Sequence, residues 1–381
     1  MAERNARPHC RVCRLPLGRE PLLTFTGMPR AAQGFPTAET LTHDRAEDLV
    51  LSQCVGCGLV QIAGRPVSYF RDVIRAAAFS DEMRGFRQRQ FRDWAIRHEL
   101  IGEPVLEVGC GRGEYLALLR DAGLSVHGVE HSRGAVDACR AAGLPVSRLF
   151  LDREGQAVPE APFAAFTSFN FMEHWPSPVR TLRAIHGNLR QGALGLVEVP
   201  NFDMILEKEI YSEFIRDHLS YFTRSTLAFA LQAAGFEVLG CESIWHDYIL
   251  SATVRRREPM DLAAQLARRE LVTQSLRQFL DRFAPSSVAI WGAGHQALAT
   301  IALTGIAPAI RYVVDSAPFK QGKFTPATHL PIVSPERLRT DPVRAVIVMA
   351  AGYSDEIVRA LRRDHAAATI AVLREHGLEP A

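Results

Sequence analysis

The segment VLEVGCGRGEYLALL, residues 105–119, decides the fold class. In it a short apolar run ends in three glycines, Gly109, Gly111 and Gly113, and a helical pattern follows directly. Glycines at such a turn let a ligand approach the backbone closely, and the following helix aims its first amides at that ligand. The spacing is G-x-G-x-G, which differs from the G-x-G-x-x-G of the dinucleotide fingerprint. The segment predicts a strand–loop–helix unit of an α/β fold.

An acidic residue and a series of alternating elements follow this loop. Glu130 ends the next apolar run, SVHGVEHS, 17 residues after Gly113, where a carboxylate is placed to bind a ribose diol. Further strand patterns are PVSRLF, AAFTSFN and GALGLVEVP, and helical patterns between them include VRTLRAIHGNLRQGA. EVLGCESI and YILSATVRR end the series as a pair of strands. The order predicts a mainly parallel, doubly wound sheet over residues 73–257.

Two C-x-x-C pairs precede this core, Cys10 with Cys13 and Cys54 with Cys57. Four thiolates are the tetrahedral set that structural Zn²⁺ prefers, and a closed set of four leaves no position for a reacting water. The alternatives are four unligated thiols or a redox pair, but no thioredoxin-like βαβ pattern surrounds either pair. The spacing predicts a zinc-binding domain over residues 1–72.

A second glycine motif lies near the end of the chain, after a polar-faced helical connector. In VAIWGAGHQALATIAL, Gly292, Gly294 and Ala297 fit G-x-G-x-x-A, and Asp315 follows Gly294 by 21 residues. Alone, this pattern is typical of NAD binding. The alternative is that the glycines only allow tight strand-to-helix packing, and the segment is short for a full dinucleotide fold. Residues 258–381 are predicted as a Rossmann-like α/β domain with its helical connector.

The bulk composition is that of an ordinary globular protein. Hydrophobic residues make up 47% of the chain and charged residues 23%, and the formal net charge is +2. A balance so close to neutral argues against nucleic acid as a partner. No apolar run approaches the roughly 20 residues that cross a bilayer, and the start lacks the apolar core of a signal peptide. We expect a cytoplasmic protein with a small-molecule partner and no membrane association.

The glycine loop and Glu130 together resemble the class I S-adenosylmethionine-dependent methyltransferases. The resemblance implies that the glycine loop lies beside the methionine part of S-adenosylmethionine and that Glu130 binds its ribose. Glu107 matches the acidic position that orders the loop or the methionine amine, and Asn170 belongs to the matching segment NFMEHWPSP. Asp152 is a candidate for the adenine edge, with a solvated loop residue as the alternative.

The whole chain resembles the three-domain sugar C-methyltransferases of deoxysugar pathways. The stretch DSAPFKQGKFTPATHLPIVSPERL carries that family's C-terminal line, although Ala327 replaces a glycine. The resemblance implies a class I methyltransferase core between a zinc-binding and a C-terminal Rossmann-like domain. It also implies a nucleotide-linked keto sugar as substrate. Its predicted contacts in the C-terminal domain are Gly292, Gly294, Asp315 and Lys320.

Enzymes of this family methylate the carbon beside a sugar ketone, which requires a base to remove a proton and form an enolate. The resemblance implies His218, in RDHLSYFT, as that base, and Asp217 as the group that orients its ring. It also implies His174 as a site residue and Tyr221 as a substrate contact. The alternative is that His218 only braces or caps the helix starting near Ser225.

The sequence departs from the family at two places. Ile215 replaces a tyrosine, and the stretch IRAAAFSDEM, residues 74–83, offers Phe79 and Ser80 where tyrosines are expected. His246, Asp247 and Tyr248, between the last two core strands, are candidates to compensate. Three other functions therefore stay open: O-methylation of a sugar or related metabolite, NAD-dependent oxidoreduction through the C-terminal loop, and ligand binding without catalysis.

Overall fold

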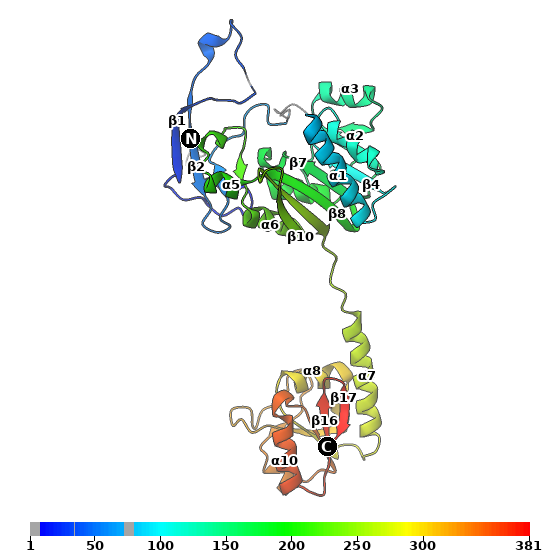
Figure 1. The fold of residues 1–381 in the computed structure, drawn as a ribbon. Helices are drawn as coiled ribbons and strands as arrows, with labels where there is room; N and C mark the ends of the chain where they lie inside the picture. The colour runs from blue at the N-terminus through cyan, green and yellow to red at the C-terminus, as the bar shows by residue number, and fades with distance from the viewer. Residues whose placement is uncertain (1–7, 34, 72–79) are drawn as a thin grey trace. The chain divides into compact units, whose positions relative to one another are not determined.

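The computed structural model describes residues 8–33, 35–71 and 80–381. The chain divides into two compact units, Met1–Glu258 and Pro259–Ala381 (Figure 1). Phe79 and the predicted domain border at residues 72–73 lie outside the described residues. The division into three domains remains a prediction.

The larger unit is built on a seven-stranded sheet with the order β10-β11-β8-β7-β4-β5-β6. Neighbouring strands from β8 through β6 are parallel, while β11 is antiparallel to both β8 and β10. The strands are β4 (Pro104–Val108), β5 (Ser125–Glu130), β6 (Val146–Arg148), β7 (Phe163–Phe169), β8 (Leu189–Pro200), β10 (Phe236–Ile244) and β11 (Ile249–Arg256). The predicted α/β class with its closing strand pair is confirmed.

Helices cover both faces of this sheet, and each face carries its own apolar core. They are α1 (Asp81–Arg97), α2 (Glu114–Asp121), α3 (Arg133–Ala141), α4 (Pro178–His186), α5 (Phe202–Glu207) and α6 (Arg224–Ala233), with 3-10 turns η3 (Met172–His174) and η4 (Tyr211–Glu213). The helical prediction over VRTLRAIHGNLRQGA was too long. The helix ends at His186, before Gly187, because Leu189 already pairs with Phe163 in the sheet.

The N-terminal residues form a four-stranded antiparallel sheet with the order β1-β2-β3-β9. Its strands are β1 (Leu23–Met28), β2 (Glu47–Gln53), β3 (Val60–Ile62) and β9 (Ser220–Tyr221), with η2 (Leu41–His43) between the first two. The fourth strand therefore comes from the loop that follows His218. The cysteine-bearing segment and the methyltransferase-like core thus share one sheet and belong to one compact unit.

The second unit is a smaller α/β unit around a six-stranded sheet with the order β14-β13-β12-β15-β16-β17. All pairs are parallel except β16 with β17. Its elements are α7 (Ala263–Leu280), β12 (Val288–Trp291), α8 (His295–Thr304), η5 (Ala307–Ala309), β13 (Ile310–Val314), β14 (Ile332–Val333), α9 (Arg337–Thr340), β15 (Ala345–Val348), η6 (Ala351–Tyr353), α10 (Ser354–Asp364), β16 (Thr369–Arg374) and β17 (Gly377–Pro380). This is the predicted Rossmann-like arrangement.

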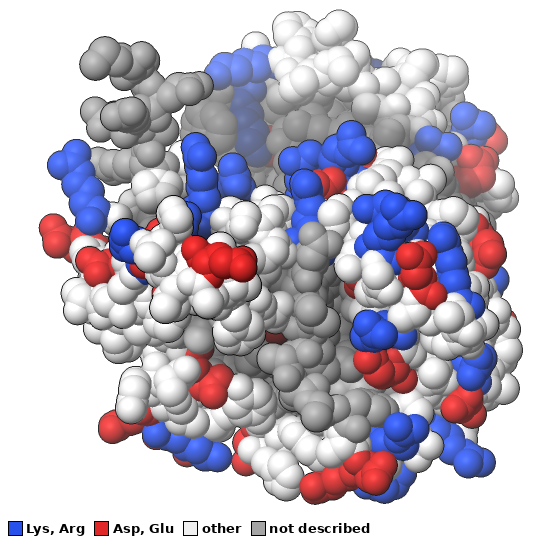
Figure 2. All heavy atoms as spheres, turned by 90° about the horizontal axis from the view of Figure 1, so that it is seen from above, with Lys and Arg blue, Asp and Glu red and all other residues white. Residues whose placement is uncertain are grey.

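The surface carries both signs of charge in close alternation. On the face shown in Figure 2, blue and red side chains are interleaved over the described residues rather than gathered into one basic field. This matches the net charge of +2. Among the described helices, none combines the length and apolar character needed to span a bilayer.

Candidate active site

The glycine loop joins β4 to α2 and has a backbone that side chains would not tolerate. All three glycines have a positive φ: 77° at Gly109, 56° at Gly111 and 91° at Gly113. A Cβ atom on Gly109 would lie 2.3 Å from Cδ1 of Phe171, so the glycine lets that ring pack flat against the loop. The predicted close-approach loop is therefore present, with an aromatic ring on one side of it.

Glu130 at the end of β5 organises this loop. Its Oε2 atom accepts a hydrogen bond from the Gly111 amide at 3.0 Å, and its Oε1 atom accepts from the amides of His131 and Ser132 at 2.7 and 2.8 Å. Beside it lies a small cavity of about 10 Å³ that opens toward solvent. The cavity is lined by Val108, Gly109, Glu130, Phe150, Phe171 and Thr181, among others. A ligand that approached the glycine loop at this place would meet the Glu130 carboxylate.

The other predicted cofactor residues lie around the same strand ends. Asn170 follows β7 with a φ of 48°, and its buried Oδ1 atom has no hydrogen-bond partner among the described residues. That oxygen fits an ammonium or hydroxyl donor of a ligand. Glu107 is buried within β4. Asp152 pairs with Arg71 at 3.3 Å beside Phe150, at the edge of an adjoining hollow rather than in the cavity itself.

His174 and His218 come together although 44 residues separate them in the chain. Their ring centroids are 4.9 Å apart in an edge-to-face arrangement, and the Phe171 ring that lines the cavity is 6.4 Å from His174. Nδ1 of His174 lies 2.8 Å from the Asp217 carbonyl oxygen, so the Nδ1–H tautomer donates this bond and leaves Nε2 bare. Burial, followed by the neighbouring His174, lowers the pKa of His218 to about 3, and burial also lowers the pKa of His174. Both imidazoles are therefore neutral at neutral pH.

The predicted role of Asp217 as the orienting partner of the His218 ring is wrong. Its Oδ1 accepts a hydrogen bond from the Tyr69 hydroxyl at 2.6 Å, and its Oδ2 accepts from the Ala32 amide at 2.8 Å. Burial, followed by the bond to Asp217, raises the pKa of Tyr69 to about 12. Asp217 thus fixes the loop to the N-terminal segment and orients His174 through its backbone carbonyl. Tyr69 had no local sequence signal that marked it.

Tyr221 also differs from its predicted role as a substrate contact. It is only 4% exposed, and its hydroxyl accepts from the Ile215 amide and donates to the Ile215 carbonyl, both at 3.0 Å. It therefore stabilises the loop that carries His218. Nor does His218 cap the next helix, because Thr223 is the N-cap of α6 and accepts from the Thr226 amide at 3.2 Å.

Glu173 is a member of the site that the sequence reasoning did not single out. It is 2% exposed, and its Oε1 lies 3.8 Å from Nε2 of His174. One ligand-type atom from each of Glu173, His174 and His218 lies within 4.8 Å of the others. Burial raises the pKa of the Glu173 carboxyl to about 8. A carboxyl that holds its proton at neutral pH is thus in place beside two neutral imidazoles.

The tip of the β10–β11 hairpin carries the residues proposed to compensate for the missing tyrosines. Trp245, His246 and Asp247 have positive φ values of 50°, 58° and 64°. His246 is exposed and lies 3.9 Å from Glu82, while Tyr248 donates a 2.5 Å hydrogen bond to Glu213. Burial and this bond raise the pKa of Tyr248. Glu173 also raises the pKa of Tyr248, so this hydroxyl lies close enough to the site to sense that carboxyl.

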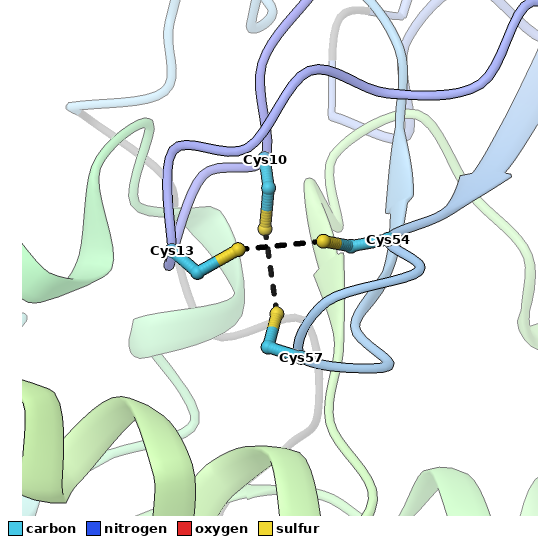
Figure 3. A group of neighbouring side chains, drawn as sticks. All are labelled: Cys10, Cys13, Cys54 and Cys57. Carbon is cyan, nitrogen blue, oxygen red and sulfur yellow. Dashed lines mark hydrogen bonds between the residues drawn. The ribbon is translucent and has the colours of Figure 1, made fainter.

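The four predicted metal ligands converge at one point, as Figure 3 shows. The sulfurs of Cys10 and Cys57 are 3.5 Å apart, those of Cys13 and Cys54 are 3.4 Å apart, and all four lie within 4.8 Å of one another. A zinc tetrahedron with arms of about 2.3 Å has sulfur–sulfur edges of roughly 3.8 Å, so the residues fit that ion. Burial raises the pKa of Cys54, but hydrogen bonds from the Cys57 and Gly56 backbone outweigh it and bring the value to about 7.

Arg11, inside the first cysteine pair, connects this cluster to the active-site loop. Its guanidinium donates to the carbonyls of Pro176, Ile62 and Gly64 at 3.1, 3.2 and 2.7 Å. Pro176 follows His174 by two residues. Arg11 therefore links the cysteine knuckle by a hydrogen bond to the segment that carries His174.

In the C-terminal unit, Asp315 is bonded to the chain's own donors. Its Oδ2 accepts from the Ala293 amide and from Nζ of Lys320, both at 2.8 Å, and its Oδ1 accepts from the Ala317 amide at 2.8 Å. A Cβ on Gly292 would lie 2.6 Å from the Met349 carbonyl oxygen, so this glycine allows two loops to pack tightly. Gly294 is the N-cap of α8. The Gly292 contact shows that this glycine serves loop packing, and the Asp315 carboxylate is bonded to donors of its own chain.

Two protein families match separate parts of the chain. Residues 72–240 match the family described as a methyltransferase domain. Residues 261–373 match the family described as the C-methyltransferase C-terminal domain. The two matches follow one another with no overlap, in the order of the two compact units.

Individual proteins are similar to parts of this chain. The C-methyltransferase NovU of Streptomyces niveus is 24% identical over 287 residues, which are 68% of this chain and 68% of that protein. The ubiquinone biosynthesis O-methyltransferase of an Azoarcus species is 25% identical over 182 residues, which are 44% of this chain and 78% of that protein. A solved S-adenosylmethionine-dependent methyltransferase from Mesorhizobium loti has 17% identity and a TM-score of 0.36, covering 46% of this chain and 98% of its own.

Proposed function

Because the chain belongs to the S-adenosylmethionine-dependent methyltransferases that carry a C-methyltransferase C-terminal domain, we propose that it methylates a carbon of a nucleotide-linked keto-deoxysugar. The observation that carries this proposal is the pair of neighbouring imidazoles, buried His174 and partly exposed His218, next to the Phe171 ring that packs on the glycine loop. Carbon methylation next to a ketone needs a base and no metal at the reacting centre.

S-adenosylmethionine supplies an electrophilic methyl group on a sulfonium centre. In the proposed complex, Glu130 holds the ribose end and the positive-φ turn at Gly109 lets the ligand approach the backbone. The buried Oδ1 atom of Asn170 accepts a hydrogen bond from the amino group of the methionine part. Aromatic side chains, Phe150 and Phe171, exclude water from the cavity.

His218 is the proposed base. It keeps a partly exposed face, and its imidazole is neutral at neutral pH, so it can accept the proton of the carbon next to the ketone. His174 lies edge-on to it, with its tautomer fixed by the Asp217 carbonyl oxygen. The pKa of about 3 that burial gives His218 makes it a weak base on its own, so the site needs a second group that favours its protonated form.

The four-cysteine cluster is proposed to hold one structural Zn²⁺. The sulfurs have the right number and spacing, and a closed set of four thiolates gives a structural site. Through Arg11 and the Pro176 carbonyl, the ion fixes the segment that carries His174. The proposed contribution of zinc is therefore to the position of an imidazole rather than to the reaction.

Carbon, and not oxygen, is the proposed acceptor atom. The O-methyltransferase relative matches only 44% of the chain, whereas the C-methyltransferase relative matches 68%. The family match at residues 261–373 adds a C-methyltransferase description to the second unit. Neither family match describes an NAD-dependent oxidoreductase.

Exchange of hydrogen for deuterium tests the base directly. In D₂O, the wild-type protein should exchange the proton next to the ketone of a nucleotide-linked 4-keto sugar when S-adenosylhomocysteine replaces the methyl donor. His218→Ala should reduce this exchange at least about a hundredfold, the usual contribution of a general base. Equal exchange by the variant would reject the assignment. Binding of both ligands by the variant, measured by calorimetry, controls for loss of the fold.

A further inference from the structure

The site contains one ionisable group that the proposed reaction has not used, the carboxyl of Glu173. It lies in η3, directly before His174, and is buried together with its neighbours Met172 and His174. Its Oε2 atom is enclosed and has no hydrogen-bond partner among the described residues. Its own carbonyl oxygen accepts from the Leu219 amide at 2.8 Å, which fixes it beside the loop of His218. An unpaired buried carboxyl is costly, so its presence at this place calls for a functional reason.

The surroundings of Glu173 favour its neutral form. No arginine or lysine pairs with it in the described part of the chain. The titratable groups near it are His174 on its own element, His218, and Tyr248, whose hydroxyl is bonded to Glu213; the carbonyl oxygen of Asp217 holds the far side of the His174 ring. On β8, the nearby charged residue Glu198 is already paired with Arg87 at 2.6 Å. Burial without a cation therefore keeps the proton on the Glu173 carboxyl at neutral pH.

We propose that Glu173 stores a proton beside the two imidazoles and delivers it to Nε2 of His174 as the acceptor's carbonyl oxygen gains negative charge. The inference rests on the proposed function. His174 can receive this proton because Nδ1–H is held by the Asp217 carbonyl oxygen, which leaves Nε2 without a proton at 3.8 Å from Oε1 of Glu173. Glu173 acts through His174 and is a positioning residue in this scheme.

The proton and electron balance of the step closes. His218 takes the proton from the acceptor carbon, and that C–H electron pair forms the enolate. The carboxyl proton of Glu173 moves to Nε2 of His174, and the positive charge of the imidazolium so formed stabilises the enolate oxygen. The resulting Glu173 carboxylate stabilises the protonated imidazole of His218. When the new C–C bond forms and the methyl–sulfur bond breaks, the ketone re-forms and Glu173 recovers its proton. His218 releases the acceptor's proton to solvent from its partly exposed face.

A neutral isostere distinguishes this proton store from a merely structural residue. Glu173→Gln keeps the shape and neutrality of the side chain but cannot release a proton. We expect kcat to fall at least about tenfold with KM and the Kd for S-adenosylmethionine within twofold of wild type, and we expect the alkaline limb of the kcat–pH profile to disappear. Glu173→Asp should restore part of kcat together with that limb. Glu207→Gln, on the exposed end of α5, is the matched control and should behave as wild type.

A readout independent of turnover separates this inference from the proposed function. In protein with ¹⁵N-labelled histidine, the ring signals of His174 and His218 should shift together between about pH 7 and 9 in the wild type and not in Glu173→Gln. If this shift is present but no keto sugar is methylated, the proposed function fails and the proton store stands. If the variant keeps the wild-type shift, or keeps wild-type kcat and its pH profile, the proton store is wrong. If Glu173→Gln does not fold, Glu173→Asp is used in its place. A kcat–pH profile of Glu173→Asp with the same alkaline limb as the wild type would also overturn the proposal.

Discussion

Adding one methyl group to Gly109 should weaken binding of S-adenosylmethionine by about tenfold or more. Alanine at this position must either keep a φ of 77°, which costs about 1–2 kcal/mol, or change the turn. Its Cβ would also lie 2.3 Å from Cδ1 of Phe171, and relieving an overpacked contact costs a further 1–3 kcal/mol or so. A tenfold change in affinity corresponds to about 1.4 kcal/mol, which is less than the sum of these two costs even at its lower end of about 2 kcal/mol.

The assay is calorimetric titration of Gly109→Ala with S-adenosylmethionine, alongside urea unfolding. Gly134→Ala is the matched control, since Gly134 lies in the first turn of α3 and its added Cβ would meet nothing within 4 Å in the described structure. In a protein that already carries Phe171→Ala, Gly109→Ala should weaken S-adenosylmethionine binding less than it does in the wild type. The ring that the added Cβ would displace is then absent. Unchanged affinity in Gly109→Ala would refute the placement of the cofactor against this loop.

Three further predictions concern the metal, a buried ion pair and stability against pH. Elemental analysis should find one zinc ion per chain. Cys13→Ser should lose the ion and lower the unfolding midpoint. A wild-type protein that is metal-free and fully stable would contradict the zinc site. Arg87→Met should lower the free energy of unfolding by about 3–5 kcal/mol, because it leaves Glu198 charged and buried, while the exposed Arg92→Met should change it little. The free energy of unfolding should fall as pH rises from about 4.5 to about 8, since folded Glu173, whose pKa is about 8, retains a proton that the unfolded chain releases. Glu173→Gln should remove this pH dependence, which at pH 7.5 is a gain of about 4 kcal/mol in the free energy of unfolding over the wild type. An unchanged dependence in the variant would show that the pKa of the Glu173 carboxyl is not raised.

The parts of the site that sequence reasoning could predict are those fixed by local backbone. The glycine loop and Glu130 belong to consecutive elements of one βαβ unit, so their spacing alone brings the carboxylate to the loop. The C-x-x-C knuckles are equally local, and only their convergence across about 40 residues needed the fold. Thr223 as the cap of α6 also follows from local chemistry.

The roles that sequence reasoning missed depend on contacts between distant segments. Asp217 was expected to orient the adjacent His218, but Tyr69 and Ala32 reach its carboxylate from 148 and 185 residues away. Tyr221 turns back onto Ile215, the position where a family tyrosine was expected. Glu173 becomes notable only when its burial is known, because an acidic residue beside a histidine is common on solvated loops. Hydrophobic periodicity alone could not show that the helix ends at His186. Leu189 belongs to strand β8, where it pairs with Phe163 of β7, and this pairing between distant segments ends the helix.

The most direct test of the central claim is the fate of a labelled methyl group. The protein should be incubated with ¹³C-methyl S-adenosylmethionine and a panel of nucleotide-linked 4-keto-deoxysugars, and the products analysed by NMR. We predict a ¹³C-methyl signal coupled to a ring carbon of one sugar, with no label on any hydroxyl and with loss of the signal in His218→Ala. Label on oxygen, or undiminished carbon methylation by His218→Ala, would contradict the account.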